Sequence, residues 1–388
     1  MLFNGYSRIS CKTLCLLFFF AKLVPRNKLH TNTLAVIVGR NMKYILLLTF
    51  YLLTTNVFSQ INFEEKSIDE TLYNRALSAD SAIKKGEFGT VHSLLIVKNG
   101  KVLFENYYNE WTRDSIHQLQ SATKSVISTL LGCALQKGII KNENDLISDY
   151  FKQYSLKGNL KQQITISDLL TQRHGFQWKE GAWEDPNNTW RKIISKEGDW
   201  YKKILDTPMD TTPGTKFVYS NAAPTLISGL IQSESKMAID SFAIHYLFEP
   251  LDIKNYWFWQ GNGKPENNGM PLISLTSRDM AKIGQLYLQN GRWNNQQILP
   301  ENYVKTATSS IVTGVGLNGA YKQYDYGYFW WSNPISQSNK KTNVFLARGA
   351  GGQNIIVSRK ENLIIVTTAW NMQQPNKVQL IYDWYLSN

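Results

Sequence analysis

Segments that read as β-strands lie at both ends of the globular part of this chain, and the stretch between them is mainly helical. Near the start, residues 93–97 and 102–108 are apolar runs joined across Asn99-Gly100, a strong signal for a two-residue hairpin turn. Near the end, residues 343–347, 354–357 and 363–369 have strand character, with a turn at 360–362. Because every strand needs a partner, we expect both ends to pair in one antiparallel sheet.

Helical patterns complete this outline. Residues 67–86 form an amphipathic pattern that stops at Gly86, and residues 378–386 show helical spacing of apolar side chains. We therefore predict an α/β (α+β) fold, with an antiparallel sheet flanked by terminal helices and a mainly helical domain beside it. The sheet subdomain covers about 60–115 and 340–388, the helical subdomain covers about 116–339, and a ligand cleft is expected between them.

The basic charge of the chain is concentrated in a leader. The formal net charge is +12, but residues 1–59 hold seven Lys and Arg and no Asp or Glu. The remaining 329 residues carry 35 basic and 30 acidic side chains, with no basic block and no zinc-finger spacing. This distribution argues against a nucleic-acid partner.

The leader itself is typical of an export signal. Met42-Lys43 precedes an apolar stretch of about ten residues, and a cleavage point near Ser59 follows. We interpret 42–59 as a signal peptide, Met42 as the start and residues 1–41 as untranslated, so that the mature chain is periplasmic or secreted and keeps only Cys133. The rival is a membrane anchor that uses residues 14–20 as well, and the choice of start methionine stays open.

Ser-x-x-Lys is the first motif with catalytic meaning, because residues i and i+3 share one face of a helix and the lysine can accept the serine proton. Among its occurrences, only Ser121 and Lys124 open a long apolar run, which predicts a buried helix. The alternative for Ser121 is a helix N-cap beside an unrelated lysine. The other occurrences lie in a helix end or in polar stretches: Ser81–Lys84, Ser233–Lys236 and Ser338–Lys341.

Tyr-x-Asn is the second motif, and it occurs at 107–109 and at 219–221. The first copy lies in the hairpin strand and is interpreted as structural. Tyr219 follows a Pro-Gly loop and precedes an apolar helix, so it can reach into a cleft. Beside a lysine its phenolate is favoured, which makes Tyr219 a candidate base and Asn221 a candidate support. A loop aromatic that packs on the core is the alternative.

The third element is the glycine-rich stretch Ala347-Arg348-Gly349-Ala350-Gly351-Gly352-Gln353 between two strands. Glycines within a strand mark close approach by another backbone or by a ligand. The Ala350 N–H could then donate to a substrate lying along the strand edge. The strand–glycine–strand context disfavours a phosphate or dinucleotide cradle.

Taken in this order, the three elements resemble the β-lactamase and penicillin-binding-protein superfamily of active-site serine enzymes, and Tyr-x-Asn resembles its class C branch. The resemblance covers roughly residues 90–372 and includes the stretches 164–175, 276–288 and 290–294. It implies that Ser121 is acylated, that Lys124 and Tyr219 share the general-base role with support from Asn221, and that the N–H groups of Ser121 and Ala350 form an oxyanion hole.

One departure bears on the substrate. Many members of this superfamily carry Lys or His where this chain has Ala347, and strand alternation keeps Arg348 from simply replacing that charge. The Gly349, Gly352 and Gln353 pattern is closer to 6-aminohexanoate-dimer hydrolases and family VIII esterases. We expect an amidase or esterase acting on small acyl compounds. The alternatives are a class C-type β-lactamase, a D-alanyl-D-alanine carboxypeptidase, and a non-catalytic binder.

Metal and cofactor chemistry finds little support in the sequence. No two histidines have ligand spacing, and a Ser-His-Asp triad built on His174 lacks the Gly-x-Ser-x-Gly elbow. We expect that the protein uses neither a metal nor a cofactor. We expect a small-molecule substrate, and the oligomeric state stays open. The aromatic run at 324–331 is either a cleft wall that selects apolar acyl groups or a core patch. The histidines interpreted as structural are His92, His117, His174 and His245.

Overall fold

A computed structural model describes residues 60–258, 272–315, 324–333 and 343–373. All the described residues lie within one compact unit of the chain, which begins at residue 58. The signal-peptide interpretation and the helix predicted at 378–386 fall outside the described residues. Within them, no helix is long and apolar enough to cross a membrane.

The predicted hairpin is present. Strand β2 (Val91–Lys98) pairs antiparallel with β3 (Lys101–Tyr107), and Asn99 and Gly100 connect them. Both turn residues have positive φ, 54° and 72°, as a tight turn matched to the strand twist requires. Asparagine and glycine are the residues that adopt this conformation at least cost, which is why the dipeptide predicted the turn.

The two ends of the globular unit meet in one sheet, as expected. Strand β14 (Leu363–Ala369) pairs antiparallel with β2, so that Ile365 lies opposite Ile96. Among the described residues the sheet has nine strands, in the order β1-β3-β2-β14-β13-β12-β11-β10-β9. The other strands of this sheet are β1 (Asn62–Lys66), β13 (Gln353–Ser358), β12 (Val344–Gly349), β11 (Trp331–Ser332), β10 (Tyr324–Tyr326) and β9 (Val312–Val315).

Two features of this sheet differ from the outline drawn from the sequence. Strand β1 pairs with β3 in the parallel direction, whereas the other pairs are antiparallel. Strands β9, β10 and β11 come from a stretch that the sequence analysis assigned to the helical subdomain, and they extend the sheet beyond β12. These strands are two to four residues long, too short for an alternating pattern to be recognised.

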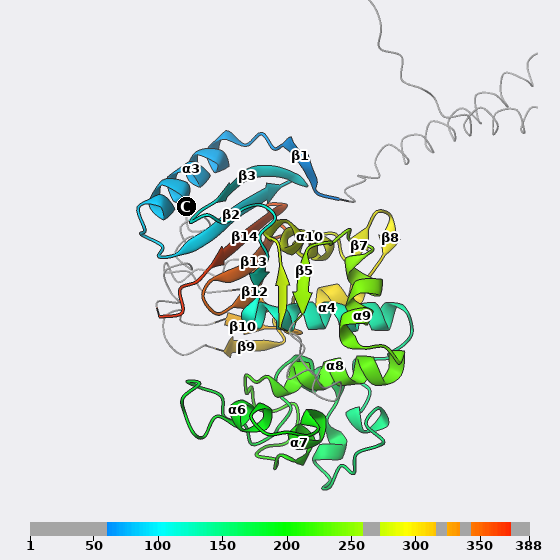
Figure 1. Ribbon diagram of the computed structural model, residues 1–388. Coiled ribbons are helices and arrows are strands. Elements are labelled where there is room, and N and C mark those ends of the chain that lie inside the picture. The colour runs from blue at the N-terminus through cyan, green and yellow to red at the C-terminus, as the bar shows by residue number, and fades with distance from the viewer. Residues whose placement is uncertain (1–59, 259–271, 316–323, 334–342, 374–388) are drawn as a thin grey trace, which may run out of the picture. The chain divides into compact units, whose positions relative to one another are not determined.

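Helices cover both faces of the sheet (Figure 1). Helix α3 (Glu70–Lys84) packs on β2 and β3, and Asp69 caps it by accepting a hydrogen bond from Leu72 N–H. Helix α10 (Ser277–Leu288) packs on β13, β14 and β2. A Cβ on Gly284 of α10 would lie 3.0 Å from methyl carbons of Ile355 and Ile364, so glycine permits this close approach.

The rest of the middle region is helical and loop-rich, as predicted. Helix α4 (Thr123–Gln136) is buried over almost its whole length and packs against α8 (Ala222–Ser235). Around this pair lie the short helices α5 (Ile166–Leu170), α6 (Thr189–Ile194), α7 (Trp200–Asp206), α9 (Ile239–Ala243), α11 (Glu301–Ala307), η1 (Gln120–Ala122), η2 (Ile147–Asp149), η3 (Lys161–Gln163) and η4 (Ile244–Phe248), and the strands β4 (His117–Gln118), β5 (Tyr256–Phe258), β6 (Ile273–Leu275), β7 (Arg292–Trp293) and β8 (Gln296–Gln297).

Candidate active site

Ser121 lies in the 3₁₀ turn η1 that leads into α4, and it is half-buried. It does not cap either helix, because the N-cap positions are Leu119 for η1 and Ala122 for α4, and neither cap uses a side-chain hydrogen bond. Gln120, directly before Ser121, has φ of +50°, a conformation that is costly for a residue with a side chain. This strain at the residue preceding the serine is typical of functional sites.

Lys124 is a buried cation, with 2% of its surface exposed. Its Nζ lies 3.4 Å from Ser121 Oγ and 2.5 Å from Asn221 Oδ1, and 4.7 Å from the centre of the Tyr219 ring. Burying an ammonium is unfavourable unless polar partners replace water. The serine hydroxyl, the asparagine carbonyl and the face of the tyrosine ring together provide that replacement.

Tyr219 and Asn221 come from the loop that leads into α8. Asn221 is the N-cap residue of α8 but makes no side-chain cap hydrogen bond, because its Oδ1 accepts from Lys124 instead. Tyr219 is half-buried and stacks on Trp331 with ring centres 5.6 Å apart. The structure therefore brings together Ser121, Lys124, Tyr219 and Asn221, which the sequence had singled out from separate motifs.

The aromatic run at 324–331 lies beneath Tyr219 as a core patch. Tyr324, Tyr326 and Trp331 are almost fully buried, and Tyr326 and Trp331 both contact the Tyr219 ring. Of the two interpretations offered by the sequence, the core patch fits these burial values and the cleft wall does not. This aromatic patch therefore packs against the Tyr219 ring and supports its position.

Ser220, between Tyr219 and Asn221, is locked by two buried side chains. Gln172 Oε1 accepts from Ser220 N–H, and Gln172 Nε2 donates to Ser220 C=O. His174 Nδ1 accepts from Phe176 N–H, so its proton is on Nε2, which donates to Ser220 Oγ at 3.0 Å. Burial lowers the pKa of His174 to about 4, so this network is held by a neutral imidazole.

This network also bears on the Ser-His-Asp alternative. His174 contacts Ser220 rather than Ser121, and both residues have no exposed surface. A substrate cannot reach a serine that is fully enclosed, so the His174–Ser220 pair is structural.

Glu180 is a residue near this site that the sequence analysis did not identify. Its Oε1 accepts hydrogen bonds from Asn221 N–H and from Trp178 Nε1, each at 2.7 Å. Burial raises the pKa of Glu180, while the charge of Lys124 and these two donors oppose the rise. A lone acid in the loop after α5 has no spacing relation to Lys124, so no sequence signal could have identified it.

The glycine-rich turn approaches the serine segment closely. A Cβ on Gly349 would lie 2.1 Å from Leu119 C=O, so only glycine fits where β12 passes the residues before Ser121. Ala350 is exposed at the turn, and Gly352 has φ of +112°. The prediction that these glycines mark close approach is confirmed at Gly349, where the neighbour is another backbone.

Ala347, at the first position of the glycine-rich stretch, is fully buried, with no exposed surface. Arg348 is half-buried, and its guanidinium carbon lies 5.5 Å from the centre of the Tyr324 ring. The guanidinium is thus held over an aromatic ring of the core patch.

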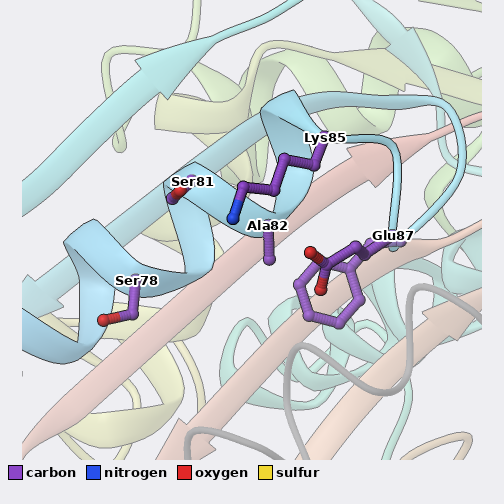
Figure 2. A pocket seen from close by; sticks show the side chains of 6 residues that line it. Ser78, Ser81, Ala82, Lys85 and Glu87 are labelled. Carbon is purple, nitrogen blue, oxygen red and sulfur yellow. The ribbon is translucent and has the colours of Figure 1, made fainter.

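The other copies of the two motifs lie in different surroundings. Lys84 pairs with Asp80 at 2.6 Å, and Ser81 borders a small polar pocket beside Lys85 and Glu87 (Figure 2). Ser233 and Lys236 lie at the end of α8, where Lys236 is its left-handed C-cap, and Ser338–Lys341 falls outside the described residues. Tyr107 belongs to β3, as predicted for a structural copy of Tyr-x-Asn.

Three further histidines of the described residues, His92, His117 and His245, lie away from the candidate site's serine network. His92 and His117 both stack on Trp111, with ring centres 4.3 and 4.2 Å from it. Burial, and secondarily His92, lower the pKa of His117 to about 3. His245 lies beside Glu249 on the surface. Across the part of the chain that the structure describes, no group of three or more His, Cys, Asp or Glu could hold a metal ion.

Comparison with known proteins places this geometry in context. A family model described as Beta-lactamase matches residues 87–383. The chain is 21% identical over 309 residues to 6-aminohexanoate-dimer hydrolase from Paenarthrobacter ureafaciens, which covers 72% of this chain and 72% of that protein. The matched span includes the segments that carry Ser121, Tyr219 and the glycine-rich turn.

Solved structures show the same fold. EstCE1, described as a hydrolase with promiscuous acyltransferase activity, superposes with a TM-score of 0.64 at 13% identity, covering 81% of this chain and 99% of its own. A family VIII carboxylesterase gives a TM-score of 0.62 at 14% identity, covering 81% and 97%. The predicted fold class and the predicted resemblance are both confirmed by these matches.

Proposed function

The chain belongs to the Beta-lactamase family, and from this premise we propose that it is a serine hydrolase that forms an acyl-enzyme on Ser121 and cleaves small amides or esters. The observation that carries the proposal is the environment of Lys124. A buried lysine whose Nζ lies 3.4 Å from Ser121 Oγ and 2.5 Å from Asn221 Oδ1 is placed to manage the proton of the serine.

In the first step, Ser121 Oγ attacks the carbonyl carbon of the substrate and loses its proton to Lys124 or Tyr219. The carbonyl oxygen becomes an oxyanion, and the tetrahedral intermediate then expels an amine or an alcohol that takes up the same proton. The product of this step is an ester between Ser121 and the acyl group. Water, deprotonated by the same base, then attacks that ester, the acyl group leaves as a carboxylic acid, and the proton held by the base returns to Ser121 Oγ.

Electrostatic stabilisation of the oxyanion is assigned to backbone N–H groups. Ser121 lies in the η1 turn that leads into α4, where N–H groups point out of the helix end, and Ala350 lies on the exposed turn after β12. The close approach of Gly349 to Leu119 supports this pairing, because it brings the turn next to the residues before the serine.

The preference for amides and esters over β-lactams rests on two supports. Ala347 offers no charge to a substrate carboxylate, and the relatives matched include a dimer hydrolase and a carboxylesterase. A class C-type β-lactamase, a D-alanyl-D-alanine carboxypeptidase and a non-catalytic binder are the alternatives.

Export of the chain belongs to the same proposal: we propose that the protein is periplasmic or secreted after cleavage near Ser59. N-terminal sequencing of the exported protein tests this part of the proposal.

The proposal is tested by intact-protein mass after brief exposure to a fluorophosphonate. We expect one adduct on the wild type and none on Ser121→Ala, with the thermal midpoint nearly unchanged. Ser81→Ala is a matched control, because Ser81 has the same spacing to a lysine but a different environment, and it should label like the wild type. A folded wild type that takes no adduct would instead support a binder.

Substrate preference is tested on fresh wild-type enzyme that has not been exposed to the fluorophosphonate, with Ser121→Ala as the blank. Short p-nitrophenyl esters and linear amides should be cleaved, and nitrocefin should be cleaved poorly. Efficient nitrocefin cleavage without ester or amide cleavage would overturn the preference and favour the β-lactamase alternative.

A further inference from the structure

Glu180 is joined to Lys124 through a single residue. Its Oε1 accepts the N–H of Asn221 at 2.7 Å, and Oδ1 of the same Asn221 accepts from Lys124 Nζ. Trp178 Nε1 donates a second hydrogen bond to the same carboxylate oxygen, which further fixes the Glu180 side chain. The position of the Lys124 partner therefore depends on a carboxylate that lies outside both motifs.

Glu180 also acts on Lys124 by charge. The two are not an ion pair within 4 Å, yet Lys124 is buried and Glu180 is half-buried, so water only partly screens their attraction. The titratable groups packed around this pair are Tyr219 from the loop before α8, Tyr326 from β10, which contacts the Tyr219 ring, and His174 from the loop of Glu180, which packs on Trp178. On the loop of Glu180 itself, Lys179 pairs with Asp185.

We propose that Glu180 is a positioning residue, which holds the Asn221 backbone in place and supplies the negative charge that balances the Lys124 ammonium. The inference rests on the proposed function, because it concerns the base that serves Ser121. A buried ammonium without this counter-charge would be less stable.

The direction of the effect is independent of which group is the base. A nearby negative charge favours the protonated form of whichever neighbouring group accepts the serine proton. The pH at which the serine becomes reactive should therefore fall when Glu180 is neutralised, whether Lys124 or Tyr219 accepts the proton.

The test measures the rate of fluorophosphonate labelling of Ser121 against pH. Glu180→Gln keeps an oxygen that can accept from Asn221 and Trp178 but removes the charge. The rising limb of its profile of labelling rate against pH should therefore move down by roughly one pH unit. Glu180→Asp keeps the charge but withdraws the acceptor, so the limb should stay while the rate falls. Glu184→Gln removes a charge from an exposed position on the same loop and should match the wild type.

The outcomes separate this inference from the proposed function. A wild type without labelling at any pH would overturn the proposed function, and with it the basis for the inference. A labelled wild type whose pH limb coincides with that of folded Glu180→Gln would overturn the inference alone. If Glu180→Gln does not fold, Glu180→Asp provides the test. A shifted pH limb in Glu180→Asp, or a labelling rate equal to that of the wild type, would overturn the inference.

Discussion

Two segments of this protein carry the same Ser-x-x-Lys spacing in opposite environments. In α3, the Lys84 side chain is 59% exposed and pairs with Asp80. At the start of α4, Lys124 is 2% exposed and is held by Ser121, Asn221 and the Tyr219 ring. The two segments therefore share the Ser-x-x-Lys spacing. They differ because Lys124 is buried and contacts polar groups from another loop, whereas Lys84 is exposed.

The difference shows what makes a lysine available for proton transfer. An exposed lysine is fully hydrated and stays protonated at neutral pH, and a nearby carboxylate strengthens that preference. A buried lysine depends on the few groups around it, so its protonation responds to those groups. The following predictions test this contrast between α3 and α4.

The largest effect is expected for the lysines themselves. Lys124→Ala removes the group closest to Ser121 Oγ and should lower the fluorophosphonate labelling rate by about a thousandfold. Lys84→Ala should leave that rate unchanged, because Lys84 contacts Asp80 and not the candidate site. Equal losses in the two variants, measured on folded protein, would remove the distinction between the two segments.

Alanine substitutions at glycines near the two segments should also differ in how much they lower the free energy of unfolding. Gly349→Ala would place a methyl group 2.1 Å from Leu119 C=O, and because two backbones meet there it should destabilise the protein by about 3 kcal/mol or more. Gly86→Ala, after α3, has open space around it and a φ of +77°, so it should cost about 1 kcal/mol. Urea unfolding gives both values.

Labelling rates complete that comparison. Folded Gly349→Ala should label slowly, because the turn that carries Ala350 is displaced from the serine segment. Gly86→Ala should label at the wild-type rate. A normal rate in Gly349→Ala would show that the turn has no part in the reaction.

The sequence predicted the parts of this fold that rest on local patterns. The Asn99-Gly100 hairpin and the meeting of β2 with β14 followed from turn chemistry and from the need of strands for partners. Ser121, Lys124, Tyr219 and Asn221 were each recognised by a short motif. Their proximity in the structure follows from the packing of α4 on α8, which no single motif encodes.

Contacts made by isolated loop residues could not be predicted in the same way. Glu180 and Gln172 reach the site because of the path of the loops after α5, and their sequence neighbours give no periodic signal. Strand β11 has two residues, which is too few for an alternating pattern. The predicted burial of the α4 helix, by contrast, followed directly from its apolar run.

The support beneath the α4 site should also make it sensitive to acid. His174 holds Ser220 as a neutral imidazole with pKa about 4, while an unfolded histidine titrates near 6.5. Between pH 7 and pH 5 the unfolded state binds more protons than the folded state, so the free energy of unfolding falls as pH falls. His174→Gln, whose amide can accept and donate similarly, should lose about 2 kcal/mol less over this range than the wild type.

The α3 segment provides the control for this measurement. Burial opposes the shift, but hydrogen bonds from Lys84, Asn106 and Tyr108 keep the pKa of Asp80 below its usual value of 3.8. The stability that Asp80 contributes is therefore present above about pH 4 and is lost only below it. Asp80→Asn should show the wild-type change between pH 7 and pH 5, and a smaller change in that range would contradict the assignment.

The smallest effect is expected for the ion pair of α3, in which Lys84 is exposed and Asp80 is not. Lys84→Gln should lower the free energy of unfolding by about 0.4 kcal/mol, the usual size of an i, i+4 pair, and the difference should fade in 1 M NaCl because salt screens the exposed lysine. The wild-type labelling rate of Ser121 should change little over the same salt range, because Lys124 is enclosed by protein. A loss above 1 kcal/mol that persists in salt would mean that Lys84 is also held by buried contacts. The two lysines would then differ in their partners alone, and exposure would no longer explain why only one of them lies at a reactive serine.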